Sequence, residues 1–170
     1  MMSAAANKAS KARWGQTTWA WMTGTFFGIG LLPGGPGTWA SLAAAAMWFF
    51  TFRAGHLSGL VLITATLAAA IVATLIGIPA SSIVARESSS DDPGHVVIDE
   101  VAGQWIALAA SPVDIRHALL AFVFFRLFDI TKPPPARQLE RLHGGLGIMM
   151  DDVAAGLYAF IACLIVHHWW

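Results

Sequence analysis

Five apolar stretches separated by polar loops dominate the sequence. Only residues 57–84 comfortably exceed the roughly 20 residues that a helix needs to cross a bilayer. Gly77 and Pro79 predict that this helix breaks late. The shorter stretches would need flanking turns to cross, or neighbouring helices that hold their polar ends at membrane depth. The pattern predicts an all-helical membrane bundle with four to five embedded helices, drawn from residues 38–52, 57–84, 101–110, 117–128 and 153–166.

The N-terminal region has a different pattern. Residues 1–16 form a basic tail with Lys8, Lys11 and Arg13, and an apolar segment follows at 17–32. This segment contains several glycines, and no small-residue cleavage site follows it, so a signal peptide is not indicated. Nearby tryptophans are typical of a membrane interface. We therefore expect 17–32 to be a membrane-surface or re-entrant element.

Composition supports an integral membrane protein. The chain is 56% hydrophobic and 12% charged, whereas about a quarter of a typical soluble domain is charged. Its 170 residues suit one domain covering 1–170. The net charge of zero gives no electrostatic basis for binding nucleic acid. The single cysteine, Cys163, excludes an internal disulfide and argues against a zinc site.

Charge also predicts a topology. The basic tail favours a cytoplasmic N-terminus. If 17–32 dips into the membrane without crossing, five alternating crossings place eight of ten lysines and arginines inside, all but Arg53 and Arg116. Nine of ten acids also lie inside, Asp114 being the exception. The bias reverses if 17–32 crosses fully, so we expect the polar loops to share the cytoplasmic face.

Seven of the ten acids gather at the edges of apolar stretches. Carboxylates are costly beside hydrocarbon, so unpaired ones there need a reason. A bound cation is the simplest reason, and clustered carboxylates suit a hard ion such as Mg²⁺. The seven are Asp91, Asp92, Asp99, Glu100, Asp129, Asp151 and Asp152.

A glycine- and proline-rich loop runs from Gly28 to Ser41, with the sequence GIGLLPGGPGTWAS. Glycines let a backbone approach a ligand, and a following helix start presents free N–H groups to an anion. Thr38 or Ser41 could add a hydroxyl. The alternative is a plain turn with a threonine cap. No Gly-Lys-Ser/Thr follows, which excludes a P-loop.

The second polar loop reads DDPGHVVIDEVAG. Asp99 and Glu100 stand at a predicted helix start, where the dipole favours negative charge. Capping alone would explain them, but not Asp91 and Asp92 earlier in the loop. His95 could act as a base, although a lone loop histidine is more often a surface residue.

The third region, FRLFDITKPPPARQLERLHGGLGIMMDDVAAG, is the densest in charge. Arg126 and Asp129 share a helical face, and Lys132 lies just past the helix, where Pro133 stops it. Cations fixed beside carboxylates suit a phosphate together with its metal. The alternative is mutual salt bridges, which is stronger for Arg137 and Arg141.

Three strings, GLLPGGPGTWAS, DPGHVVIDEVAG and the third region, resemble the phosphatidylglycerophosphatase A family in order and spacing, over residues 28–158. The resemblance implies a Mg²⁺-dependent phosphatase of the bacterial inner membrane. It would remove the terminal phosphate of phosphatidylglycerophosphate to give phosphatidylglycerol, at a site facing the cytoplasm. The matching motif positions are Asp92, Asp99, Glu100, Asp129, Lys132, Asp151 and Asp152.

Our hypothesis assigns roles to these positions. The attacking group is a metal-activated water or an aspartate. No Asp-x-Asp-x-Thr or Cys-x5-Arg motif is present, which favours water. The predicted metal ligands are Asp99, Glu100, Asp151 and Asp152; the catalytic residues Asp92, Asp99, Asp129, Lys132 and Asp152; and the substrate-binding residues Thr38, Ser41, Arg126, Lys132 and Arg137.

Other classes of membrane protein that act on lipids or cations fit the sequence less well. The Asp-Gly-x2-Ala-Arg string of CDP-alcohol phosphotransferases and the Pro-Ser-Gly-His motif of phosphatidic-acid-type phosphatases are both missing. A small cation-binding or transporting protein without hydrolase activity is the main alternative. Its acids should lie inside the spans, whereas these lie at span ends beside lysine and arginine, which favours an anionic substrate.

Overall fold

The computed structural model describes residues 17–169; the basic tail, residues 1–16, and Trp170 lie outside the described residues. Every regular element within 17–169 is a helix, as predicted. The elements are α2 (Thr18–Gly24), the 3-10 helix η1 (Ile29–Leu31), α3 (Pro36–Ala54), α4 (Gly59–Ser88), α5 (Ile98–Leu108), α6 (Ile115–Thr131), α7 (Ala136–Leu139) and α8 (Gly145–Trp169).

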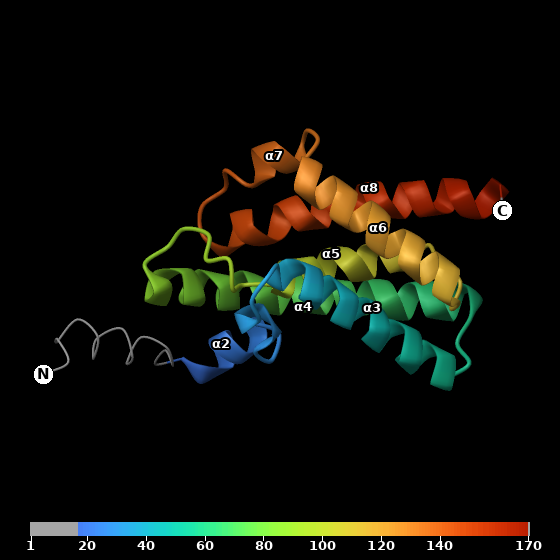
Figure 1. The fold of residues 1–170 in the computed structure, drawn as a ribbon, viewed down its shortest axis with the longest axis horizontal. Coiled ribbons are helices and arrows are strands. Elements are labelled where there is room, and N and C mark those ends of the chain that lie inside the picture. The colour runs from blue at the N-terminus through green and yellow to red at the C-terminus, as the bar shows by residue number, and fades with distance from the viewer. Residues whose placement is uncertain (1–16, 170) are drawn as a thin grey trace, which may run out of the picture.

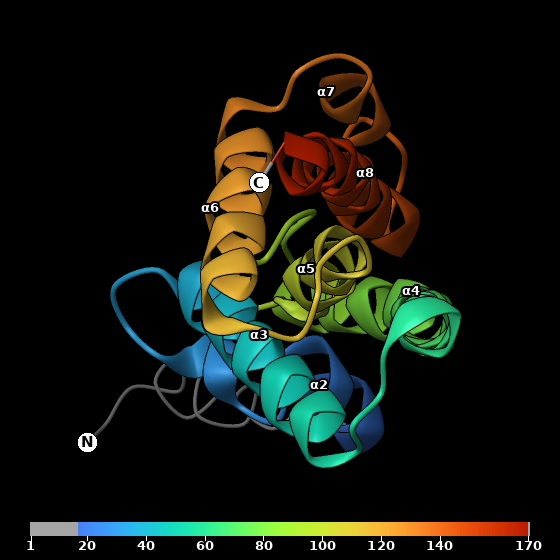
Figure 2. The same ribbon diagram turned by 90° about the vertical axis from the view of Figure 1, so that its right-hand side faces the viewer.

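Helix α5 forms the centre of the bundle. It contacts α3, α4, α6 and α8, and the view along the bundle shows these helices around it (Figure 2). Most of its side chains are buried, including Val101, Ala102 and Leu108. With 11 residues it is about 16 Å long, too short to cross a hydrocarbon core of about 30 Å alone.

Small residues bring α5 and α8 close together. A Cβ atom on Gly156 would lie 2.5 Å from the carbonyl oxygen of Gly103, and one on Gly103 would lie 2.6 Å from the carbonyl oxygen of Asp152. Real Cβ atoms do not approach backbone so closely, so both positions need glycine. Because Asp152 lies beside this crossing, the packing of α5 on α8 also positions acidic residues of both helices.

Replacing Gly156 with valine is expected to destabilise the protein by about 1–3 kcal/mol, because the added side chain must push α5 and α8 apart. Thermal unfolding in detergent measures the effect. The matched control is Ala68→Val, which adds bulk at an exposed position of α4 and should change the melting temperature little. Equal melting of the two variants would contradict the requirement for a close crossing.

Two helix boundaries differ from the prediction. Helix α4 continues through Gly77 and Pro79 to Ser88. Close packing at Gly77, where an added Cβ would lie 2.7 Å from Met149 Sδ, stabilises this part of the helix. It outweighs the loss of one backbone hydrogen bond at the proline. Helix α8 begins at Gly145, so Asp151 and Asp152 lie inside this helix and not before it.

The segment 17–32 forms no membrane-crossing helix. It consists of α2, a turn and η1. Thr17 Oγ1 and Trp21 Nε1 donate hydrogen bonds of 2.9 and 2.6 Å to the Glu87 carboxylate at the end of α4. The segment is therefore held against the last turns of α4, while Trp19 and Phe27 remain exposed.

The loops sort to two ends of the bundle. The α4–α5 loop and the α6–α8 segment lie at one end, whereas the α3–α4 and α5–α6 loops and the end of α8 lie at the other (Figure 1). This is the arrangement that alternating crossings predict for the two acidic loops. Helices α4 and α8 are each long and apolar enough to cross a membrane, which indicates membrane association.

Candidate active site

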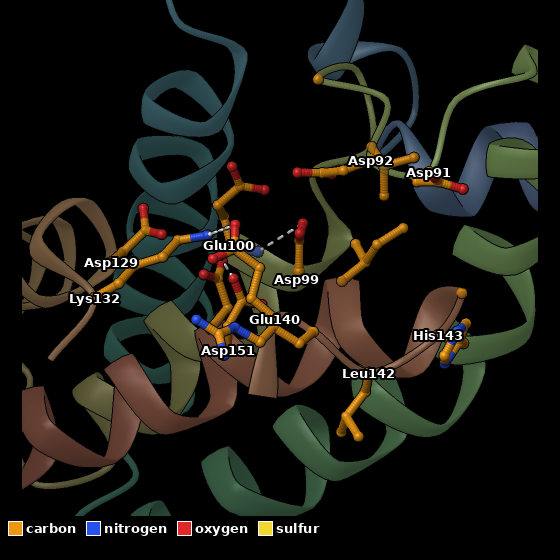
Figure 3. A pocket seen from close by; sticks show the side chains of 16 residues that line it. Asp91, Asp92, Asp99, Glu100, Asp129, Lys132, Glu140, Leu142, His143 and Asp151 are labelled. Carbon is orange, nitrogen blue, oxygen red and sulfur yellow. Dashed lines mark hydrogen bonds and ion pairs between the residues drawn. The ribbon is translucent and has the colours of Figure 1, made fainter. Parts of the chain in front are cut away.

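A cavity of about 430 Å³ opens at the end of the bundle that carries the acidic loops. It is bounded by the α4–α5 loop, the start of α5, the end of α6, the segment before α8 and the first turns of α8. In Figure 3, Asp91 and Asp92 are drawn apart from Asp129 and Lys132, with Glu100 and Asp151 near the latter pair. All seven clustered acids line this one cavity: Asp91, Asp92, Asp99, Glu100, Asp129, Asp151 and Asp152.

Three of these acids form a group that can hold a metal ion. Asp99 and Glu100 lie in the first turn of α5 and Asp152 lies in α8, and each offers an oxygen within 4.8 Å of the others. Glu100 Oε2 and Asp152 Oδ2 are buried and have no hydrogen-bond partner among the described residues, and the same is true of Asp151 Oδ1. Unpartnered carboxylate oxygens at this spacing fit a hard divalent cation.

Asp99 lies in the first turn of α5, next to the Glu100 carboxylate. Its Oδ1 accepts a 3.0 Å hydrogen bond from the backbone N–H of Glu100. A cation beside the two carboxylates would favour their charged forms.

Lys132 is a cation that lines the cavity. It caps the end of α6 in a left-handed conformation, with φ 43°, and its Nζ donates to Asp151 Oδ2 and Glu140 Oε1, both at 2.8 Å. Burial opposes its charge, but these hydrogen bonds and the two carboxylate charges outweigh burial and raise the pKa of Lys132. The side chain is therefore a fixed positive charge at neutral pH.

Arg126 lies behind the cavity wall. Its NH1 atom contacts Asp129 Oδ2 at 2.6 Å, so the predicted shared face of these two residues is confirmed. Arg126 itself does not line the cavity. The salt bridges considered as an alternative are present for both Arg126 and Lys132, and each one holds a carboxylate that borders the cavity.

The glycine- and proline-rich loop reaches the site through Gly37. A Cβ atom there would overlap Glu100 Oε1 and lie 3.2 Å from Arg126 NH1. Backbone approach was predicted, but the group approached is a carboxylate of the site. Helix α3 begins at Pro36, so Ser41 lies within it. Ser41 is fully buried, and its hydroxyl donates to the Gly37 carbonyl, one turn back, at 2.8 Å. Neither Thr38 nor Ser41 lines the cavity, which does not support their predicted role in substrate binding.

The segment between α6 and α8 supplies different residues from those predicted. Arg137 is exposed on α7 and does not line the cavity, whereas Glu140, Arg141 and His143 do. Their common signal is position, since they directly precede the Gly144-Gly145 pair where the chain turns into α8. Sequence reasoning did not select Glu140 and His143, and it judged Arg141 as a salt-bridge residue.

His95 lies outside the cavity. Its ring stacks on Trp21 with centroids 5.0 Å apart, and its Nε2 lies 3.2 Å from Ser88 Oγ. Burial lowers the pKa of His95. These contacts tie the α4–α5 loop to α2 and α4, so the structure favours a role in holding the loop that carries Asp91 and Asp92.

The chain resembles known proteins over most of its length. The family model for phosphatidylglycerophosphatase A matches residues 22–167. A protein of Escherichia coli named phosphatidylglycerophosphatase A is 40% identical over 147 residues, 84% of this chain and 81% of the relative. A Haemophilus influenzae protein of the same name is 37% identical over 145 residues, 84% of this chain and 85% of the relative.

A third relative carries a different name. A Bacteroides thetaiotaomicron protein, provisionally named a phosphatidylinositol-3-phosphatase, is 40% identical over 143 residues, 82% of this chain and 88% of the relative. No solved structure was found to match. Because the family model and these relatives cover most of the chain, it belongs to the phosphatidylglycerophosphatase A family of phosphatases.

Proposed function

We propose that this protein hydrolyses the terminal phosphomonoester of phosphatidylglycerophosphate, giving phosphatidylglycerol and phosphate, as a step of phospholipid biosynthesis. The observation that carries the proposal is the meeting of all seven clustered acids and Lys132 in one cavity at one end of the bundle. The names of the Escherichia coli and Haemophilus influenzae relatives support the choice of lipid.

The cation in this proposal is Mg²⁺. Asp99, Glu100 and Asp152 would hold it, with Asp151 beside them, because their oxygens are close together and partly unpartnered. A Mg²⁺ ion there would neutralise phosphate charge and promote ionisation of a water nucleophile.

The chain's own residues then have separate tasks. Lys132 donates to a non-bridging phosphate oxygen, and Asp151 and Glu140 hold its ammonium group in place. Asp129, fixed by Arg126, accepts the proton of the attacking water. Asp92, on the other side of the cavity, orients the headgroup. Trapping of an acyl phosphate on any aspartate would contradict attack by water.

The proposed setting is the bacterial inner membrane, with residues 1–170 forming one domain. Helices α3, α4, α5, α6 and α8 would supply the five alternating crossings, with the short α5 enclosed by the other four. The site would face the cytoplasm, since the predicted charge bias places the acidic loops there. A diacyl lipid cannot leave the bilayer cheaply, so its headgroup would enter from the cytoplasmic leaflet.

Phosphate release from phosphatidylglycerophosphate by the purified protein in detergent tests the function. Release is expected with Mg²⁺, should stop when EDTA is added, and should return when Mg²⁺ is restored. No release in any condition from folded protein would defeat the enzyme proposal and leave the cation-binding alternative. Release that resists EDTA would keep the phosphatase and remove the metal.

A further inference from the structure

A second hollow adjoins the cavity. It is a groove of about 440 Å³ between the last turns of α4 and the loop that follows. It shares Asp91 and Gly144 with the cavity, so the two hollows meet along these residues. The remaining polar groups of the groove come from Ser82, Arg86, Ser89 and Ser90.

Arg86 is the cation of this groove. It is exposed, and its Nε donates a 3.3 Å hydrogen bond to the carbonyl of Ser82 on its own helix. It forms no salt bridge with a carboxylate of the described residues, whereas Arg126 and Lys132 are both paired. The adjacent Glu87 is occupied by α2. The rest of the Arg86 guanidinium is therefore available to an anion, and guanidinium suits a phosphate geometrically.

An apolar face of α4 leads to Arg86. Leu75, Pro79, Ser82 and Arg86 follow one another at spacings of four, three and four residues, so they lie on one side of the helix. Leu75 is 65% exposed. It lies about 16 Å from Arg86 along the helix axis. This side of α4 changes from apolar to polar residues at Ser82. Acyl chains lying along this face would place the first phosphate of a lipid at Arg86.

We propose that this groove binds the phosphodiester of a glycerophospholipid whose terminal phosphomonoester occupies the cavity, and that Arg86 determines specificity for such lipids. The inference rests on the proposed function. Phosphatidylglycerophosphate carries a diester next to the diacylglycerol and a monoester beyond a glycerol bridge. A phosphatidylinositol 3-phosphate has the same order of diester, polyol and monoester. Phosphatidic acid has a monoester alone.

The test compares wild type with Arg86→Gln in mixed micelles at saturating Mg²⁺. We expect the KM for phosphatidylglycerophosphate to rise roughly ten- to hundredfold, the effect of losing a charge-assisted hydrogen bond, with a much smaller change in kcat. Inhibition by phosphatidylglycerol, which has the diester alone, should weaken by a similar factor. Inhibition by inorganic phosphate, which fits the cavity alone, should not change. Arg86→Lys should restore part of the loss.

The control is Arg53→Gln, which removes an exposed arginine at the opposite end of the bundle. It should leave KM, kcat and both inhibition constants unchanged. Wild-type turnover in the same assay tests the proposed function separately. If wild type hydrolyses phosphatidylglycerophosphate and Arg86→Gln has the same KM, the groove does not bind the diester. If Arg86→Gln weakens inhibition by phosphatidylglycerol and by inorganic phosphate equally, Arg86 acts as a general surface charge and the inference is overturned.

Discussion

Replacing Asp152 with asparagine should abolish phosphate release and, in the absence of metal, stabilise the fold. Asp152 is only 3% exposed, its Oδ2 has no hydrogen-bond partner within residues 17–169, and the charges of Asp129, Glu100 and Asp151 act on it. Loss of one charge at the reaction centre should lower turnover by at least about 10²-fold. Loss of one like charge from a buried cluster should add about 0.5–2 kcal/mol of stability. Phosphate release and thermal unfolding in EDTA measure the two effects.

Added Mg²⁺ should reduce the stability difference between wild type and Asp152→Asn. A ligand that binds only the folded state stabilises it by an amount that grows with the logarithm of its affinity. Wild type should therefore gain more stability from Mg²⁺ than Asp152→Asn. The difference between their melting temperatures should narrow, or its sign should reverse. Equal gains would show that Asp152 is not a ligand, whatever the activity.

Asp114→Ala provides the opposite control. Asp114 caps α6 at the other end of the bundle, where its Oδ1 accepts from the backbone N–H groups of Arg116 at 2.9 Å and His117 at 3.1 Å. Loss of the cap should cost about 1 kcal/mol and leave turnover unchanged. A destabilised Asp152→Asn in EDTA would contradict repulsion among the acids, and near-wild-type turnover would remove Asp152 from the site.

Charged residues at helix ends proved more predictive than glycine content. Asp99 and Glu100 at a helix start and Lys132 at a helix end follow from local chemistry, and the structure confirms both. The predicted start of α8 was wrong, because the helix begins earlier, at a glycine, a residue that normally disfavours helix. An added Cβ on Gly145 would lie 2.7 Å from Ser82 Oγ, so close packing on α4 selects glycine there, which a local pattern does not reveal.

The candidate site shows the same division. The seven acids could be predicted as one group because carboxylates are costly beside hydrocarbon and helix capping accounts for only two of them, Asp99 and Glu100. The partners of the cations could not. The pairing of Lys132 with Glu140 depends on how the α6–α8 segment folds back, and an exposed glutamate is common in any protein. The role of Ser41 in substrate binding stays a prediction, but its hydroxyl donates one turn back along α3, to the Gly37 carbonyl, which a local pattern does not reveal.

Replacing Lys132 with alanine should lower turnover by roughly 10²–10³-fold, the cost of removing one fixed group that stabilises transition-state charge. Asp151 would also lose its cation beside other acids, so some destabilisation should accompany the loss. Because the pKa of Lys132 is raised, its charge persists as pH rises through the ordinary lysine range. Wild-type turnover should therefore show no alkaline loss caused by Lys132. Kinetics as a function of pH and thermal unfolding test both statements.

Two further variants separate catalysis from packing. Lys132→Arg keeps the charge and should recover stability more fully than turnover, because guanidinium does not reproduce the position of a compact ammonium. Arg137→Ala removes an exposed cation five residues along the chain, outside the cavity, and should resemble wild type in both measurements. If Lys132→Ala turns over like Arg137→Ala while it melts lower, the ammonium only balances Asp151 and Glu140. The phosphate would then need another cation, and Arg141, which also lines the cavity, would be the next residue to replace.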